Sequence, residues 1–313
     1  MILINNKIRV LIVFSFSFLT EFIVAQVTPK VIDSISYGAV INAPETSKRM
    51  KYYGNARLTL NQAHFENWIS GGESSLTALL GLDYNFNYSD RKGLVWDSNL
   101  ILSIGITKIS GNSFNRKADD RFEINSLVGK QINQYWNYSA FVNFKTQLLH
   151  GYRYFTEDDT EQREKISRIF SPAIAQAGLG WYYKKNKNLR MTLSPITARI
   201  IMVGNFYTQN LKEGEKYFGV GAGETTKLFF GASVTGYFKT TLMEGITMEN
   251  KFNFYVNYLE NTQNIDVDWN ANFRLKVNDK ISSSLIIHFL YDDDLIKRLQ
   301  LRELFGVGIN VDL

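Results

Sequence analysis

The stretch from Tyr135 to Tyr154 alternates apolar and polar side chains for longer than most globular strands run. One face carries Trp136, Tyr138, Ala140, Val142, Phe144, Thr146 and Leu148, and the other carries Asn137, Ser139, Phe141, Asn143, Lys145 and Gln147. Successive side chains of a strand point to opposite faces, so one face requires an apolar medium and the other requires water or polar partners. If other segments repeat the pattern, the chain is a closed barrel with lipid outside and a polar lumen.

About twelve segments with this strand period follow one another to the end of the chain. They are residues 52–65, 74–88, 93–108, 120–131, 135–150, 171–183, 187–203, 225–241, 245–258, 264–277, 280–291 and 302–313. The lipid-side face of the second contains Leu76, Ala78, Leu80 and Leu82, and that of the tenth contains Val267, Trp269, Ala271 and Phe273.

The lengths of the connections distinguish a membrane barrel from a soluble fold. Periodicity alone does not reject a soluble sandwich or lipocalin, in which the apolar face points inward. Every second connection is tight, whereas residues 109–119, 151–170 and 204–224 form long connections. Short turns at one rim, long loops at the other and an even strand number are typical of outer-membrane barrels. The sequence therefore predicts an all-β fold, a transmembrane antiparallel up-and-down β-barrel of about twelve strands of the outer-membrane type.

The first 51 residues are predicted to lie outside the barrel. Lys7 and Arg9 precede an apolar run that ends near Ala25, which is the order of a cleaved secretory signal peptide in residues 1–25. An N-terminal membrane anchor is the alternative, although the run is short for one. Residues 26–51 contain Pro29 and Pro44 and show no period, so they are interpreted as a periplasmic lead-in or a short plug, and residues 52–313 as the barrel.

Aromatic residues and the last segment support the barrel. The strand ends beside the tight turns carry Tyr84, Phe86, Tyr88, Trp96, Trp136, Tyr138, Trp181 and Tyr183, and the other rim carries Phe254, Tyr258, Phe289 and Tyr291. Two interfacial girdles are expected from this placement. The chain ends on an alternating segment with Phe305, Val307 and Ile309 on its apolar face, as outer-membrane barrels do, although Leu313 stands where an aromatic residue is usual.

Composition excludes several classes of protein. The chain has no Cys, so disulfides, thiolate metal sites and a lipoprotein anchor are excluded. After Gln26 no apolar run approaches the roughly 20 residues that a membrane helix needs. The net charge is +5, but the basic residues are scattered, so no nucleic-acid partner is expected.

The inward faces of the predicted strands carry charges of both signs. The candidate lumen-lining residues are Arg57, Asp83, Asp97, Glu123, Lys145, Glu249, Lys251, Asp266, Asp268, Arg274 and Lys276. Counting back from the turns places Glu123 opposite or diagonal to Lys145, and Glu249 opposite or diagonal to Arg274, where opposite charges pair. Large residues such as Phe141, Phe229, Tyr237 and Tyr255 favour a filled lumen, whereas Gly81, Gly105, Gly178, Gly180, Gly306 and Gly308 favour space. The sequence leaves both possibilities open.

No set of residues points to catalysis, a metal or another cofactor. His64 and His150 fall at loop-side strand ends and His288 faces the lumen, so the three His do not have metal-ligand spacing. The segment Tyr207-Thr208-Gln209 is similar to a fragment of the outer-membrane phospholipases, but the catalytic segment of that family does not follow it. The glycine-rich residues 219–223 follow a loop and do not open a helix, so a phosphate-binding loop is not expected.

Several motifs together resemble one protein family. They are Asn67-Trp68-Ile69-Ser70-Gly71-Gly72, Lys117-Ala118-Asp119-Asp120-Arg121-Phe122, Phe144-Lys145-Thr146-Gln147 with Gly151-Tyr152, and Ser171-Pro172. This set, spread from about Ala56 to Tyr291, resembles a family of uncharacterised outer-membrane proteins of Bacteroidota that is defined as a domain of unknown function. The resemblance implies the barrel and its location, and it implies no activity.

Two functions are compatible with these observations. The first is a narrow channel or passive transporter in the cell outer membrane, in contact with lipid and passing small polar solutes. The second is a non-conducting accessory barrel that interacts with other outer-membrane proteins. For the second, the long loops supply a surface, and Trp68, Gly71 and Gly72 form an outer-loop motif with an aromatic anchor.

Overall fold

A computed structural model describes residues 50–66, 72–90, 92–278, 280–292 and 296–312. All of them lie in the compact unit formed by residues 31–313. The predicted leader and all but the last two residues of the predicted lead-in or plug lie outside the described residues. Among the described residues, no helix is long and apolar enough to cross a membrane.

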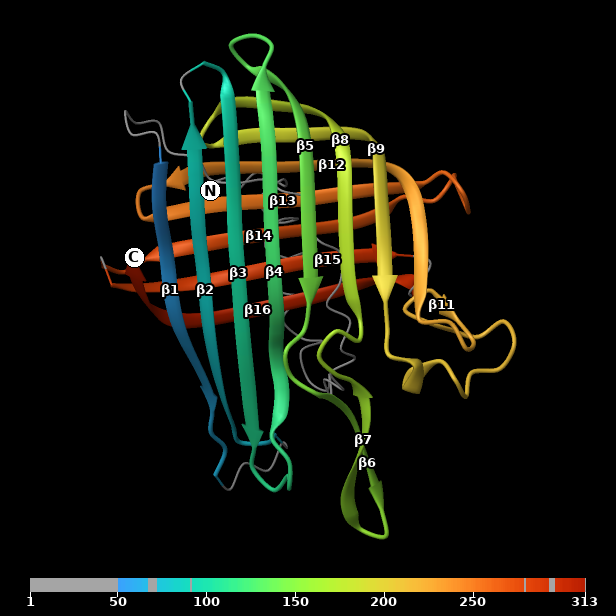
Figure 1. Ribbon diagram of the computed structural model, residues 1–313. Helices are drawn as coiled ribbons and strands as arrows, with labels where there is room; N and C mark the ends of the chain where they lie inside the picture. Colours follow the sequence, from blue (N-terminus) through green and yellow to red (C-terminus); the bar gives the residue numbers. More distant parts are fainter. Residues whose placement is uncertain (1–49, 67–71, 91, 279, 293–295, 313) are drawn as a thin grey trace, which may run out of the picture. The chain divides into compact units, whose positions relative to one another are not determined.

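Twelve antiparallel strands close into one barrel (Figure 1). They are β1 (Met50–Ala63), β2 (Ser75–Ser89), β3 (Leu94–Ile109), β4 (Arg116–Gln131), β5 (Trp136–Thr146), β8 (Ala173–Asn186), β9 (Leu189–Met202), β12 (Thr226–Met243), β13 (Ile246–Asn257), β14 (Asp266–Lys276), β15 (Ile281–Asp292) and β16 (Ile296–Asp312). Neighbours in the barrel are neighbours in this series, and β1 pairs with β16 to close it. The predicted fold class and strand number are confirmed.

Three strand ends differ from the prediction by four residues or more. β4 begins four residues earlier than predicted and β16 six residues earlier. In both strands, the residues before the predicted start also pair with the neighbouring strand. β5 ends at Thr146 and does not reach His150. The Thr146 hydroxyl donates to the carbonyl oxygen of Pro172 at 3.0 Å, and this contact lies where the chain leaves the sheet.

The longest connection contains its own two-stranded sheet outside the barrel. β6 (Gly151–Glu157) and β7 (Thr160–Ser167) form a hairpin at the loop-side rim (Figure 1). Asp158 and Asp159 both have positive φ angles, 47° and 56°, which a tight two-residue hairpin turn requires. The next long connection contains the short helix η1 (Asn205–Tyr207) and the strands β10 (Lys216–Tyr217) and β11 (Val220–Gly221).

The outward face of the barrel is apolar and exposed. On β5 and β8, Tyr138, Val142 and Leu179 are 61%, 56% and 55% exposed, whereas the inward residues on either side of Tyr138 and Val142 are buried. Exposed apolar side chains continue around the barrel at Leu58, Leu60, Leu76, Leu80, Ile124, Val128, Leu228, Leu301, Phe305, Val307 and Ile309. Soluble proteins rarely expose contiguous apolar surface of this kind, so the alternative of a sandwich or lipocalin is wrong and the outer face is a lipid-facing one.

Aromatic contacts lie at both rims. On the turn side, Phe86 contacts Tyr52 and Trp96, and Tyr183 contacts Trp136. On the loop side, Phe230 contacts Tyr258 and Trp269 stacks on Phe289. The pairs join neighbouring strands at the levels where the sequence predicted interfacial girdles.

The inner face combines packed regions with at least one open position. Phe141 is buried with Leu127 and Tyr182, and Phe229 and Tyr255 are buried beneath Val220 of the loop that carries β11. A Cβ atom added to Gly178 would lie 2.5 Å from the Phe141 ring, so this glycine makes room for a neighbour and does not leave a gap. A Cβ added to Gly81 would meet nothing within 4 Å. Of these two glycines, only Gly81 leaves space.

The lipid-facing assignment predicts a depth-dependent cost for a charge. Leu179→Arg, in the middle of β8, should lower the free energy of unfolding in liposomes by roughly 2–4 kcal/mol, because the charge would lie in hydrocarbon. Val277→Arg at the turn rim is the matched control and should cost about 0–1 kcal/mol. Urea titrations of both variants measure the difference, and equal stabilities would contradict a membrane-embedded outer face.

Candidate functional site

The predicted lumen residues differ in how deeply they are buried. Asp97, Glu123, Lys145, Asp266 and Asp268 are buried, and Glu123 and Asp268 are fully so. Arg57, Asp83, Glu249, Lys251 and Arg274 are half-buried, whereas Lys276 is exposed beside the turn after β14. The buried set therefore gathers mostly in the loop-side half of the barrel.

Glu123 is the centre of a polar cluster on β4 and β5. It lies directly opposite Lys145 in the register of the two strands, as predicted. Its carboxylate accepts hydrogen bonds from Arg121 Nε at 2.8 Å, from Asn125 at 2.9 Å and from Asn143 at 3.1 Å. A fully buried carboxylate is costly unless such donors surround it, and this one has them.

Glu249 lies diagonal to Arg274 rather than opposite to it, because β13 pairs Thr247 with Arg274. Its ion pair is with Lys239 of the neighbouring strand β12, directly opposite it, at 2.5 Å. On β2 and β3, Asn99 donates to Asp83 at 2.7 Å, and Asn87 donates to Asp97. These contacts join adjacent strands along the wall of the turn-side half.

Further buried residues line the lumen besides the predicted charged set; the sequence predicted the inward position of His288 but not those of Arg199 and Asp292. Arg199 on β9 forms an ion pair with Asp266 at 2.8 Å and lies 4.0 Å from Asp292. His288 on β15 contacts Asp268 at 2.7 Å. A strict alternation along β9 does not place Arg199 inward, because a bulge near Ile196 shifts the register of the strand. The inward positions are even-numbered before the bulge (Arg190, Thr192, Ser194) and odd-numbered after it (Thr197, Arg199).

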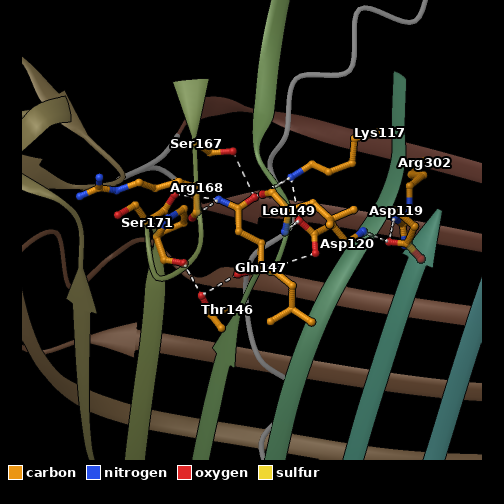
Figure 2. A network of polar contacts seen from close by, with 12 residues as sticks. Lys117, Asp119, Asp120, Thr146, Gln147, Leu149, Ser167, Arg168, Ser171 and Arg302 are labelled. Atoms are coloured by element: carbon orange, nitrogen blue, oxygen red, sulfur yellow. Dashed lines mark hydrogen bonds and ion pairs between the residues drawn. The ribbon is translucent and has the colours of Figure 1, made fainter. Parts of the chain in front are cut away.

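Three of the four motifs that carry the family resemblance meet at the loop-side mouth, namely those around Lys117, Gln147 and Ser171 (Figure 2). Lys117 Nζ donates to Asp120 at 2.9 Å and to the Gln147 side-chain oxygen at 2.8 Å. Asp120 accepts the backbone N–H groups of Leu148 and Leu149 at 2.8 and 2.9 Å. The Gln147 amide nitrogen donates to the carbonyl oxygen of Ser171 at 2.7 Å. Residues from three separate segments are thereby tied together at the point where the chain leaves the barrel after β5.

The hairpin β6–β7 is clamped to the connection between β3 and β4. Glu161 pairs with Arg116 and accepts the backbone N–H of Ser113 at 2.8 Å. The Arg116 guanidinium lies 3.5 Å from the centre of the Tyr154 ring, and the Tyr154 hydroxyl donates to the carbonyl oxygen of Asn115 at 3.0 Å. Burial raises the pKa of Tyr154, so its phenol keeps the proton that it donates.

Other groups in the loops are also held in place. Tyr217 stacks on Tyr207 and donates to the carbonyl oxygen of Ile166 at 2.6 Å, which links the β10–β11 connection to β7. Burial raises the pKa of both phenols. At the rim of β12, a hydrogen bond from Lys227 lowers the pKa of Glu260. Non-covalent contacts therefore hold several loops together at the mouth.

A small pocket lies inside this mouth. It is lined by Asp120, Lys145, Thr146, Gln147, Pro172, Ile174 and Phe218. Its volume is about 10 Å³, which is the space of roughly one water molecule. The mouth is closely packed at this level.

The other candidates from the sequence that the structure describes lie at the loop-side rim. His64 lies 3.9 Å from Glu66 at the rim, and the His150 ring contacts Tyr152. Within the described residues, no group of three or more His, Asp or Glu side chains is arranged to hold a metal ion. Trp68 and Gly71 lie outside the described residues, and Gly72 has a φ angle of 133°.

The closed pairing, the apolar outer face and the polar inner face define the class of the protein as a transmembrane β-barrel of the outer-membrane type. Residues 60–152 match a family model described as a protein of unknown function (DUF3078). The match covers less than half of the chain, and Ser171-Pro172 lies beyond it. Origin in Bacteroidota stays a prediction.

Comparison with solved structures finds other barrels at low similarity. The translocator domain of the autotransporter NalP from Neisseria meningitidis is 7% identical, with 85% of this chain and 88% of that chain covered and a TM-score of 0.40. An outer membrane channel from Pseudomonas putida F1 is 11% identical, with 90% and 98% covered and a TM-score of 0.36. A search of curated proteins finds no match. Since these TM-scores are below 0.5, the class of the protein rests on its own strand pairing and surfaces.

Gln147 is predicted to anchor the hairpin. Gln147→Ala should raise the rate of trypsin cleavage at Arg153, Arg163 and Lys165 by about tenfold or more, because each buried hydrogen bond that is lost costs roughly 1–3 kcal/mol. Mass spectrometry of the fragments measures cleavage in the hairpin and in the barrel separately. Gln162→Ala, on the exposed hairpin surface, is the control, and equal cleavage of the two variants would contradict the anchoring role.

Lys145 and Glu123 are predicted to be energetically coupled. Lys145→Ala should lower the free energy of unfolding by roughly 3 kcal/mol or more, because it leaves a buried carboxylate with one cation fewer. Adding Glu123→Ala should recover part of this loss. Urea-unfolding midpoints of the wild type, both single variants and the double variant in liposomes give the coupling energy. A value of zero would show that the two side chains act independently.

Proposed function

We propose that the protein is a narrow channel or passive transporter for small polar solutes in the cell outer membrane. The observation that carries the proposal is the polar inner face, which extends along the strands from the turn rim to the loop rim. On β5 it comprises Asn137, Ser139, Asn143 and Lys145, and on β9 it comprises Arg190, Thr192, Ser194, Thr197 and Arg199. A pathway for polar solutes requires a polar inner face of this kind.

The proposed pathway is narrow. Twelve strands lie between the small barrels that side chains fill and the wide barrels with an aqueous channel. The buried cluster of Leu127, Phe141 and Tyr182 occupies part of the lumen, and the open position at Gly81 leaves part of it unfilled. Solutes of the size of inorganic ions and small organic molecules suit such a cross-section.

A second candidate is a non-conducting accessory barrel that binds other outer-membrane proteins. The observation that favours it is the clamped hairpin β6–β7. An isolated two-stranded hairpin is marginally stable, so the contacts of Arg116, Glu161 and Tyr154 maintain a defined surface outside the barrel. Such a surface suits recognition by a protein partner.

Planar-bilayer recording tests the channel. The reconstituted protein should give small, reproducible conductance steps in potassium chloride, and Gly81→Trp should reduce them by about half or more, because the indole would occupy the open space of the lumen. Leu80→Trp, on the lipid face of the same strand, is the control and should leave the steps unchanged. A correctly folded barrel that never conducts would remove the channel from consideration.

Purification in mild detergent tests the accessory barrel. If the hairpin binds a partner, the natively expressed protein should elute with a second protein at a fixed ratio, and the complex should dissociate when Arg116→Ala and Glu161→Ala release the clamp. Elution as a lone monomer with both the native and the altered hairpin would argue against this role.

A further inference from the structure

Arg199 and Asp266 form an ion pair across the lumen. Their strands, β9 and β14, are not neighbours in the barrel, because β12 and β13 lie between them. Adjacent strands are about 4.8 Å apart, so side chains from strands this far apart reach 2.8 Å only by crossing the interior. Both side chains are buried, with Arg199 4% exposed. The pair therefore bridges two parts of the barrel wall.

Other pairs of opposite charges also lie across the lumen. Arg199 also faces Asp292 on β15 at 4.0 Å, with three strands between them. Asp268 on β14 lies within electrostatic reach of Lys145 on β5 and of Arg121 on β4. Four or five strands separate Asp268 from these cations around the shorter path of the barrel. Several charges on one wall thus meet charges of opposite sign on the other.

The two walls differ in sign at this level. Arg121, Lys145 and Arg199 lie on β4, β5 and β9, and Asp266, Asp268 and Asp292 lie on β14 and β15. Groups of the other kind on the two walls are held locally: Glu123 by Arg121 and Asp120 by Lys117 on the basic wall, and His288 by Asp268 on the acidic wall. Nearer the mouth, the contact between Asp119 and Arg302 also crosses the lumen, with the opposite polarity.

A solute that passes this level must separate the buried charges of the two walls. A neutral solute leaves both charges uncompensated, and a singly charged solute leaves one uncompensated, which is the costly case for a buried ion pair. A solute with a cationic and an anionic group can contact both walls at once and replace the interaction that it breaks. The alignment of its two charges with the two walls also fixes its orientation.

We propose that the loop-side half of the lumen selects small zwitterionic solutes, whose anionic group pairs with Arg199 and whose cationic group pairs with Asp266. The inference rests on the proposed channel function and adds the chemical class of the solute. It assigns the selecting role to the charges of β9 and β14 and not to the hairpin outside the barrel.

Liposome swelling with the full-length protein tests this selection. The probes are taurine as the zwitterion, ethanesulfonate as the matched anion without the ammonium group, choline as the cation and erythritol as the neutral solute. Taurine should enter about tenfold faster or more than each of the other three, because only it compensates both buried charges.

Two charge-neutralising variants give shifts in opposite directions. Asp266→Asn should raise the entry rate of ethanesulfonate relative to choline, because the positive charge of Arg199 then attracts an anion without Asp266 beside it. Arg199→Gln should raise that of choline relative to ethanesulfonate, because the acidic wall then dominates. Glu260→Gln, which removes the partner of Lys227 at the exposed rim, is the matched control and should leave the order of the four solutes unchanged. Heat-modifiable gel mobility verifies that each variant is folded.

The outcomes separate this inference from the channel itself. Faster entry of taurine in the wild type and opposite shifts in the two variants would support it. If solutes enter but taurine is not preferred, the selection is wrong and the channel stands. If no solute enters and potassium chloride gives no conductance, the channel is wrong and the selection is wrong with it. The comparison of solutes in the wild type decides the matter even if a variant does not fold.

Discussion

The hydrogen bonds that join β1 to β16 are the constraint on which the rest of the structure depends. Hydrocarbon offers no partner for a backbone N–H or C=O group, so a membrane-spanning sheet must close. The pairing of Asn55 with Asp312 through Leu60 with Val307 makes this closure. Once the sheet is closed, every strand has one face toward lipid and one toward the lumen. The alternating sequence then has a single solution, with apolar residues outside and polar residues inside.

With this arrangement, the burial of polar groups inside the barrel becomes the main energetic cost of the fold. A lumen lined by Asn, Ser, Asp, Lys and Arg cannot be packed as an apolar core, and each buried polar group requires a partner. In the turn-side half the partners lie on adjacent strands, as with Lys239 and Glu249. In the loop-side half some partners lie on the same or the adjacent strand, as with Glu123 and Arg121, and others lie across the lumen, as with Arg199 and Asp266. The second arrangement is weaker as a structural element than an apolar core of equal volume, and it can respond to a charged solute.

The sequence predicts the parts of the fold that depend on alternation and predicts poorly those that depend on interruptions of it. The strands, the two rims, the lipid face and the position of Lys145 opposite Glu123 follow from a period of two and from turn lengths. Arg199 does not, because the bulge near Ile196 reverses the faces of β9, and the one sequence signal for it is Pro195, since a central strand accepts a proline mainly at a bulge. The hairpin β6–β7 lies in a segment that the sequence predicts as a long connection, because its two strands are short, and the two consecutive Asp residues at its turn are the local signal for it. Contacts across the lumen require the curvature of the whole barrel, which no local pattern contains.

The motif Phe144-Lys145-Thr146-Gln147 shows how closely the mouth and the lumen are coupled. Lys145 lies inside the barrel beside Glu123, and Gln147, two residues later, donates to the Ser171 carbonyl oxygen on the backbone that returns from the hairpin. The hydroxyl of Thr146, between them, donates a hydrogen bond to the carbonyl oxygen of Pro172, directly before the next barrel strand. A displacement of the hairpin would therefore act on the end of β5 and on the position of the Lys145 ammonium group. The loops and the charge pattern of the lumen depend on the same few residues, so the outer surface of this barrel and its interior constrain each other.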